Sequence, residues 1–455
     1  MEQLLQQISI IVWGPWTVIA LVGLGVYLTI GTRFLQVRKF PFILKETFGK
    51  IFMKKSEIKG EGTLTPFQSA TTALASTVGV GSIVGVATAL AFGGPGSIFW
   101  MWIAAFFGMC TKYAEITLSI AYREKNEEGE FVGGPTYYMR KGLNSKFLAS
   151  WFVVTLILNT LSGTMIQSNA LAGNIMYYFN VPSKIVGFVI IALVGIVSMG
   201  GIGRIGKVTS KLIPSKVILY LTSGIIVILF NITKVPDAFM MIFKCAFSPA
   251  SVGGGIGGFA VAQAIRYGIN KGLYSNEAGQ GTAPIAHATA KTDHPARQGM
   301  WGIVEVFIVT FVICTITSLA ILTTGVLGSG QSPNILTSVA FGKVSPIFSY
   351  VVSISVVLCA YSTLIGLCYY GESTLNYIGG AKLGKCYRYV FLVFIFLGSV
   401  GALKMVWSIG EIVIGLGALS NIIAIVRLSP QVFKLTREFF DDNDENEEIE
   451  YKSAG

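Results

Sequence analysis

The chain has 455 residues, of which 53% are hydrophobic and only 13% are charged, and its mean hydropathy is +0.66. A soluble domain carries about 25% charged residues, so this composition excludes an ordinary soluble enzyme or a string of soluble domains. The net charge is +11, but the basic residues lie mainly in short loops between apolar runs. This pattern indicates membrane topology, not nucleic-acid binding. We therefore expect one large all-α domain embedded in a lipid bilayer.

Eleven apolar runs are long enough to cross about 30 Å of hydrocarbon. They predict transmembrane helices at roughly 9–31, 66–93, 97–121, 148–171, 184–201, 214–232, 252–273, 298–324, 345–371, 387–403 and 406–428. Together they predict a single transmembrane domain over residues 1–437. The following segment, 438–455, is acidic and lacks apolar anchors, so it predicts a disordered cytoplasmic tail.

The first apolar run has no basic segment before it and no cleavage site after it, so it reads as a retained span and not as a signal peptide. A strongly basic loop, 33–59, follows it. Basic loops stay in the cytoplasm, which places the N-terminus outside and, after eleven crossings, the C-terminus inside. Only a few basic residues then lie on the outer side, namely Lys184, Lys234, Lys244, Lys343 and Lys404. We expect a multi-pass protein of the plasma or inner membrane.

Two of the predicted spans contain clusters of glycine, at 79–85 in the second and at 253–258 in the seventh. Each glycine costs a helix about 1 kcal/mol relative to alanine, so such clusters indicate an unwound segment. The simpler alternative is that the glycines only allow close helix packing. Broken helices at matching positions of two halves favour an inverted repeat with a binding site near the middle of the bilayer.

The sequence offers no evident catalytic or metal-binding constellation. Its six cysteines show no CxxC spacing, and His287 and His294 lie in one loop without cysteine partners. No nucleophile stands beside a base in any recognisable pattern. We therefore expect neither an enzyme nor a cofactor.

Lys112 and Glu115 lie three residues apart within a predicted span. A lone charge in a span costs about 2.5–3.5 kcal/mol, which favours pairing of the two side chains. We predict that they form a structural or gating ion pair.

Four long motifs resemble the alanine-or-glycine:cation symporters, also called the sodium:alanine symporters. They are STVGVGSIVGVATALAFGGPGSIFWMWIAAFFGMCTKYAEITLSIAYR (76–123), VGGPTYYMRKGL (132–143), GLYSNEAGQGTAPIAHATAKTDHPARQGM (272–300) and AYSTLIGLCYYGE (360–372). The resemblance implies a leucine-transporter-type fold, with one extra N-terminal helix before a five-plus-five inverted repeat. The repeats would span about 66–232 and 252–428, with helices 2 and 7 broken. It also implies sodium-driven uptake of alanine, glycine or a similar amino acid.

A zwitterionic substrate needs partners for both of its charges. Backbone amides freed at the break around Gly79–Gly85 suit its carboxylate, and neutral polar groups on other spans suit the rest. No acidic residue occupies an evident position for a cationic substrate side chain. The predicted substrate-binding residues are Gly79, Val80, Gly81, Ser82, Thr164, Gln167, Thr363 and Leu367.

The sequence departs from the family pattern where its site is expected. Ser82 stands where the family has asparagine, Val309 replaces an acidic residue, and Leu367 replaces tryptophan; Ile414 replaces a further asparagine. The pair Ser82 and Val309 belongs to one of the two sodium sites that the resemblance implies, and this site is therefore in doubt. The second implied sodium site keeps its ligands, which are Val78, Gly81, Ser362 and Thr363. Leu367 is smaller than tryptophan and predicts a roomier pocket, unless Tyr361 or Tyr369 fills the space.

We predict a monomeric carrier whose partners are a small neutral amino acid, sodium and the lipid bilayer. A proton-coupled carrier, or a carrier of larger neutral amino acids with the same fold, is the first alternative. A sensor that binds an amino acid without transporting it is the second.

Overall fold

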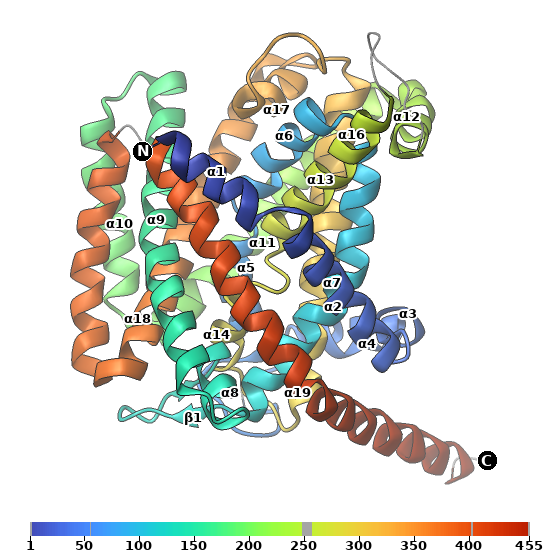
Figure 1. The fold of residues 1–455 in the computed structure, drawn as a ribbon, viewed down its shortest axis with the longest axis vertical. Coiled ribbons are helices and arrows are strands. Elements are labelled where there is room, and N and C mark those ends of the chain that lie inside the picture. The colour runs from blue at the N-terminus through green and yellow to red at the C-terminus, as the bar shows by residue number, and fades with distance from the viewer. Residues whose placement is uncertain (1, 55, 248–256, 402–403, 454–455) are drawn as a thin grey trace.

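The computed structural model describes residues 2–54, 56–247, 257–401 and 404–453. Within these ranges the only strands are β1 (Glu124–Lys125) and β2 (Phe131–Val132), which form one short antiparallel hairpin. Every other regular element there is a helix, so the predicted all-α class is confirmed (Figure 1).

The first half of the chain begins with a group of helices that precedes the bundle. These are α1 (Glu2–Val12), α2 (Pro15–Gly31), α3 (Leu35–Arg38), α4 (Phe40–Thr47) and η1 (Phe48–Lys50). The elements of the bundle follow: α5 (Pro66–Thr77), η2 (Val80–Ser82), α6 (Val84–Gly93), α7 (Gly96–Ala121), α8 (Pro135–Lys141), α9 (Lys146–Phe179), α10 (Ser183–Ser198), α11 (Gly201–Phe230), η3 (Ile232–Lys234) and α12 (Val235–Phe247).

The second half contains α13 (Gly257–Asn276), α14 (Ala283–His287), α15 (Pro295–Val306), η4 (Phe307–Cys314), α16 (Thr315–Thr323), α17 (Pro333–Gly342), α18 (Pro346–Val400) and α19 (Lys404–Ser453). The segment η4 is a π-helix that continues α15 into α16. Helix α18 is interrupted at Gly379 and Gly380, whose φ angles are −134° and +70°. The predicted spans 345–371 and 387–403 lie on the two sides of this kink.

Six of the described helices are long and apolar enough to cross a membrane, and a seventh crossing results if the bent pair α5 and α6 counts as one span. This establishes several membrane-spanning helices. The count of eleven spans, the division into two repeats and the orientation of the termini stay predictions.

Helix α5 starts and ends where local chemistry requires. Thr65 and Gln68 form a capping box at its start, and Pro66 occupies its first position. The helix ends at Val78, and the chain then turns by 65° into α6. The predicted break in the second span is therefore present. The other predicted break falls on 253–258, of which residues 253–256 lie outside the described part of the chain.

The break packs closely against α18. A Cβ atom on Gly79 would lie 3.0 Å from Thr363 Oγ1, and one on Gly366 would lie 3.2 Å from the Cβ of Ser76. Both glycines therefore allow α5 and α18 to approach more closely than larger residues would permit. This contact brings the unwound backbone next to polar side chains of α18.

Around this centre, α9 packs along α18, α7 packs against α13 and α15, and α11 packs against α5 and α18. Helix α19 crosses the front of the bundle and contacts α9 and α1 (Figure 1). Ser9 Oγ donates to Glu411 Oε2 at 2.7 Å, and Trp13 Nε1 donates to the Glu411 carbonyl at 2.8 Å. The beginning of the described chain and its last helix, α19, are thus joined by hydrogen bonds.

The acidic tail differs from the expectation. Helix α19 continues to Ser453, whereas the sequence predicts disorder from residue 438. Glutamate is a good helix former, and the preceding helix supplies the nucleus that an isolated acidic peptide would lack.

Glu115 on α7 organises the loop that follows α13. Its carboxylate accepts hydrogen bonds from the backbone N–H groups of Gly279 and Gly281 at 3.3 and 2.9 Å, and from Asn421 Nδ2 at 2.5 Å. The side chain is fully buried. Glu115 therefore ties this loop to α7 and α19, and it forms no ion pair with Lys112 among the described contacts.

Substitution Glu115→Ala is expected to destabilise the protein clearly, because two buried N–H groups would lose their acceptor at about 1–3 kcal/mol each. The measurement is the melting temperature in detergent. Glu128→Ala is the matched control, since Glu128 is exposed and its ion pair among the described residues is with the exposed Lys385. Equal melting temperatures for the two variants would contradict this role of Glu115.

Candidate functional site

A cavity of about 60 Å³ lies against the break between α5 and η2. It is lined by five of the predicted substrate residues, namely Gly79, Gly81, Gln167, Thr363 and Leu367. The remaining lining side chains come mainly from α9 and from α13 with the loop after it, and include Asn159, Ser162, Ile166, Tyr274, Glu277, Gln280 and Thr282. The structure thus brings most of the predicted substrate site together at one helix break.

Two polar groups of this cavity have no hydrogen-bond partner among the described residues. Gln167 Oε1 is buried and makes no hydrogen bond. Within the described residues, the backbone N–H group of Gly81 donates to no acceptor, because the turn at the break removes its helical partner. Buried polar groups are nearly always paired, so the Gln167 oxygen is available to a ligand, and the N–H group of Gly81 is available beside it.

Glu277 adds a carboxylate that the sequence analysis did not assign to the site. It follows directly after α13, has a left-handed backbone (φ +56°) and lines the cavity. Its Oε2 accepts hydrogen bonds from Thr282 Oγ1 at 2.6 Å and from Ser76 Oγ at 3.4 Å. A partly paired carboxylate therefore lies in the cavity, at a position that the sequence analysis did not single out.

Three predicted substrate residues do not line this cavity. Thr164 is buried and donates to the Thr160 carbonyl of its own helix at 2.6 Å. Val80 lines a separate cavity of about 340 Å³ between α9 and α17. Ser82 is buried and accepts a hydrogen bond from Ser275 Oγ at 3.2 Å.

Leu367 lines the cavity beside Gly163 of α9, where an added Cβ would lie 3.1 Å from Leu367 Cδ1. Ile414 of α19 lines the same cavity. Neither Tyr361 nor Tyr369 is among the lining residues, and the hydroxyl of Tyr361 donates to the Leu193 carbonyl instead. The apolar side of the cavity is therefore formed by aliphatic side chains.

The position predicted for sodium contains a lysine ammonium. Lys216 of α11 is 1% exposed, and its Nζ donates to the Val78 carbonyl at 2.6 Å and to Ser362 Oγ at 2.5 Å. Thr363 Oγ1, beside Ser362, donates to the Ala75 carbonyl at 3.2 Å. Two of the four predicted sodium ligands are thus bonded to a protein cation that the sequence analysis did not single out.

The other sodium position, which the sequence places in doubt, has apolar packing. Val309 is fully buried and packs in one apolar cluster with Val78 and Ile83. Ser275 and Ser82 bond to each other nearby. Within the described residues no group of three or more His, Cys, Asp or Glu side chains could hold a metal ion.

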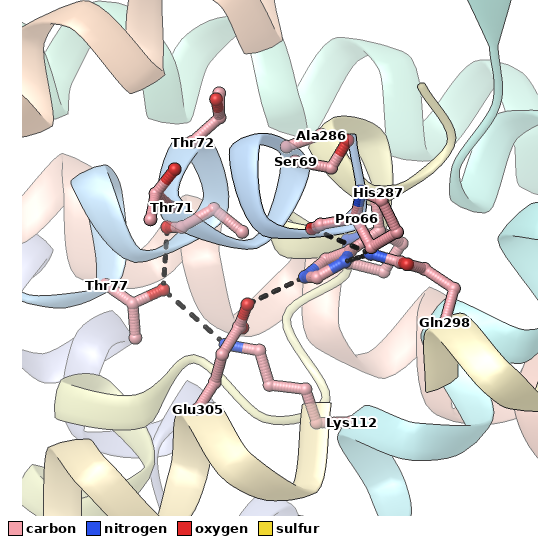
Figure 2. A network of polar contacts seen from close by, with 12 residues as sticks. Pro66, Ser69, Thr71, Thr72, Thr77, Lys112, Ala286, His287, Gln298 and Glu305 are labelled. Atoms are coloured by element: carbon pink, nitrogen blue, oxygen red, sulfur yellow. Dashed lines mark hydrogen bonds and ion pairs between the residues drawn. The ribbon is translucent and has the colours of Figure 1, made fainter. Parts of the chain in front are cut away.

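A second buried lysine, Lys112, belongs to a network that reaches Thr77 at the end of α5 (Figure 2). Lys112 Nζ donates to the Asn276 carbonyl at 2.8 Å and lies 3.4 Å from Glu305 Oε2. Glu305 Oε1 is 2.7 Å from His287 Nε2, and His287 Nδ1 is 2.8 Å from Gln298 Nε2. The predicted Lys112–Glu115 pair is wrong: spacing places both residues on one helix face, but the nearest carboxylate comes from α15.

A broken helix with a small polar cavity at the break, inside a bundle of apolar helices, is typical of membrane transporters. The chain belongs to the sodium:alanine symporter family, whose profile matches residues 1–453. The resemblance seen in the sequence motifs is confirmed, and the chain is a multi-pass membrane transporter and not an enzyme.

Individual relatives agree with this assignment. The chain is 41% identical to the transporter YflA of Bacillus subtilis (strain 168), over 97% of this chain and 94% of the relative. It is 38% identical to the sodium/alanine symporter AgcS of Methanococcus maripaludis, over 96% of both chains. A solved substrate-bound, outward-open structure of a Na⁺-coupled sialic acid symporter has a TM-score of 0.54 at 12% identity, covering 92% of this chain and 98% of that chain. The last likeness shows the fold alone.

Substitution Gln167→Ala is expected to weaken substrate binding by about 0.5–1.5 kcal/mol, roughly two- to twelvefold, because the ligand would lose one hydrogen bond. Calorimetric titration of the detergent-solubilised protein measures this change. Thr164→Val on the same helix is the control, since its hydroxyl bonds to its own backbone, and it should leave the affinity unchanged. An unaltered affinity in Gln167→Ala would remove this residue from the site.

Proposed function

We propose that this protein is a cation-coupled symporter that carries a small neutral amino acid across a membrane. The observation that carries the proposal is the cavity at the break, with the unpaired side-chain oxygen of Gln167 and the unpaired backbone N–H group of Gly81. The family assignment supports the transport class, and AgcS is named for sodium and alanine.

The polar groups fit the two ends of a zwitterion. The free N–H group of Gly81 suits the substrate carboxylate, since the backbone there is unwound and positively polarised. The carboxylate of Glu277 and the Oε1 atom of Gln167 suit the substrate ammonium. A carboxylate for the ammonium and an unpaired backbone donor for the carboxylate together favour an amino acid without a charged side chain.

The size of the cavity supports a small substrate. A cavity needs about 10–15 Å³ to hold one water molecule. A cavity of about 60 Å³ therefore admits roughly four to six non-hydrogen atoms. Alanine and glycine lie in this range. The aliphatic wall formed by Leu367 and Ile414 favours an apolar substrate side chain.

Uptake into proteoliposomes tests the proposal. Proteoliposomes are loaded inside with an unlabelled amino acid, and labelled alanine, glycine, valine or glutamine is added outside. This assay measures exchange without any ion gradient. Saturable exchange of alanine or glycine is expected. Binding without exchange would favour a sensor, and exchange of only the larger amino acids would favour the alternative substrate class.

Substitution Leu367→Trp is expected to restrict the cavity to the smallest substrates. The indole would occupy the space beside Gly163 that a substrate side chain would otherwise fill. Each substrate methylene that can no longer be buried there costs about 0.8 kcal/mol of binding free energy, or about fourfold in affinity. Competition against labelled glycine measures this ranking. Leu367→Met preserves the volume and serves as the control. If Leu367→Trp leaves the ranking of alanine, valine and methionine unaltered, Leu367 does not limit the pocket.

A further inference from the structure

Lys112 bonds to the ends of two helices that border the cavity at the α5 break. Its Nζ donates to the carbonyl of Asn276, the last residue of α13, at 2.8 Å. It also donates to Oγ1 of Thr77, the last residue of α5, at 3.5 Å (Figure 2). The side chain of Lys112 is fully buried. One lysine from α7 therefore holds together two helix ends that lie far apart in the sequence.

Each of these helix ends continues into a group that suits one end of the substrate. Glu277 follows directly after α13, has a left-handed backbone and brings its carboxylate to the cavity. Gly79 follows shortly after Thr77, and its N–H donates to the Thr77 carbonyl at 2.9 Å. Gly81, with its unpaired N–H group, lines the cavity just beyond. The position of Lys112 thus bears on the distance between the Glu277 carboxylate and the Gly81 N–H group.

Lys112 is itself held by a chain of buried side chains (Figure 2). Glu305 Oε2 lies 3.4 Å from its Nζ, and Glu305 Oε1 lies 2.7 Å from His287 Nε2. The amide nitrogen of Gln298 donates to His287 Nδ1 at 2.8 Å and to the Pro66 carbonyl at 3.4 Å. Since Nδ1 accepts this hydrogen bond, the ring N–H is at Nε2 and points to Glu305. These contacts connect the first residue of α5 to its last.

The charges in this region leave one carboxylate without a cation. Lys112 and Glu305 are both fully buried and offset each other. Glu277 accepts hydrogen bonds from two hydroxyl groups, but among the described residues it forms no ion pair. A charge withdrawn from water without a partner is costly. The ammonium group of a substrate would supply the missing cation.

We propose that Lys112 is a positioning residue that sets the distance between Glu277 and the Gly81 N–H group, and that it thereby selects α-amino acids over amino acids with a longer backbone. This inference rests on the proposed function and names the class of amino acid that the site accepts. Lys112 does not line the cavity, so it acts through the two helix ends. Binding groups must be held within about 0.5 Å of the productive geometry by the residues behind them.

Alanine and β-alanine are the probes that isolate this distance. They are isomers with the same net charge, but in β-alanine one more methylene separates the ammonium group from the carboxylate. The added C–C bond of about 1.5 Å exceeds the tolerance of such a site. Glycine is the second reference, because it lacks the methyl group that β-alanine also lacks.

The first measurement is calorimetric titration of the full-length wild type in detergent with alanine, glycine and β-alanine. β-Alanine is expected to bind more weakly than either of the others by about tenfold or more, the cost of one lost hydrogen bond to a charged group. Equal affinity for alanine and β-alanine would overturn the inference while leaving the proposed function intact. Absence of any binding of alanine or glycine would instead refute the proposed function.

The variant Glu305→Gln tests the role of Lys112 with little change of shape. Glutamine keeps an oxygen for His287 but removes the charge that holds Lys112. Glu277 is a carboxylate that also interacts electrostatically with Lys112, so the lysine is then drawn toward it. The preference for alanine over β-alanine should therefore fall by about tenfold, to near equality.

Glu372→Gln is the matched control, because Glu372 forms a buried ion pair with Arg388 across the kink of α18 and does not line the cavity. Both variants are expected to lower the melting temperature, but only Glu305→Gln should change the preference. An unaltered preference in folded Glu305→Gln would overturn the inference, because a merely structural network affects stability alone.

A milder variant decides the question if Glu305→Gln does not fold. Gln298→Met keeps both charges and removes the donor to His287 and to the Pro66 carbonyl. It should lower the preference for alanine over β-alanine by about twofold or more, the effect of one ordinary hydrogen bond. The wild-type preference retained in Gln298→Met would then overturn the inference.

Discussion

The structure depends on how its interrupted helices are completed inside a membrane. A helix that ends in hydrocarbon leaves carbonyl groups without partners, and no water is present to satisfy them. Two buried lysines donate hydrogen bonds to such carbonyl groups. Lys216 donates to the Val78 carbonyl at the end of α5, and Lys112 donates to the Asn276 carbonyl at the end of α13. A cation at the negative end of a helix also opposes its dipole, so each lysine fixes an interruption in two ways.

The carbonyl side of the α5 break is thus completed by the protein, whereas its N–H side is left open toward the cavity. Small residues make this possible, since Gly79 and Gly366 let α18 approach until its hydroxyls reach the carbonyls of α5. The outcome is a rigid frame around an unsatisfied donor. The unpaired N–H group of Gly81 faces the cavity, and the hydrogen bonds that complete the end of α5 include those from Lys216 and from the hydroxyls of α18.

Much of this could be predicted from local sequence signals. The glycines at 79–85 predict the break because clustered glycines weaken a helix. The leucine at position 367 predicts an aliphatic lining of the cavity because this follows from the residue type alone. Lys216 could not be recognised, since it follows Lys207 and Lys211 and resembles another basic residue at a cytoplasmic span end. Glu277 was missed because it lies just beyond the predicted span. Lys216 and Glu277 each contact residues that are distant in the sequence, and the spacing of residues along the chain does not reveal such contacts.

The hydrogen bonds from Ser9 and Trp13 to Glu411 join residues about four hundred positions apart. During synthesis the first helix is made long before Glu411. The hydroxyl of Ser9 and the indole N–H of Trp13 therefore lack this partner until the chain is nearly complete. Contacts of such sequence separation are slow to form and expose the intermediate to misassembly. The bundle is therefore expected to close late, and truncation near Glu411 would harm the beginning of the chain as much as its end.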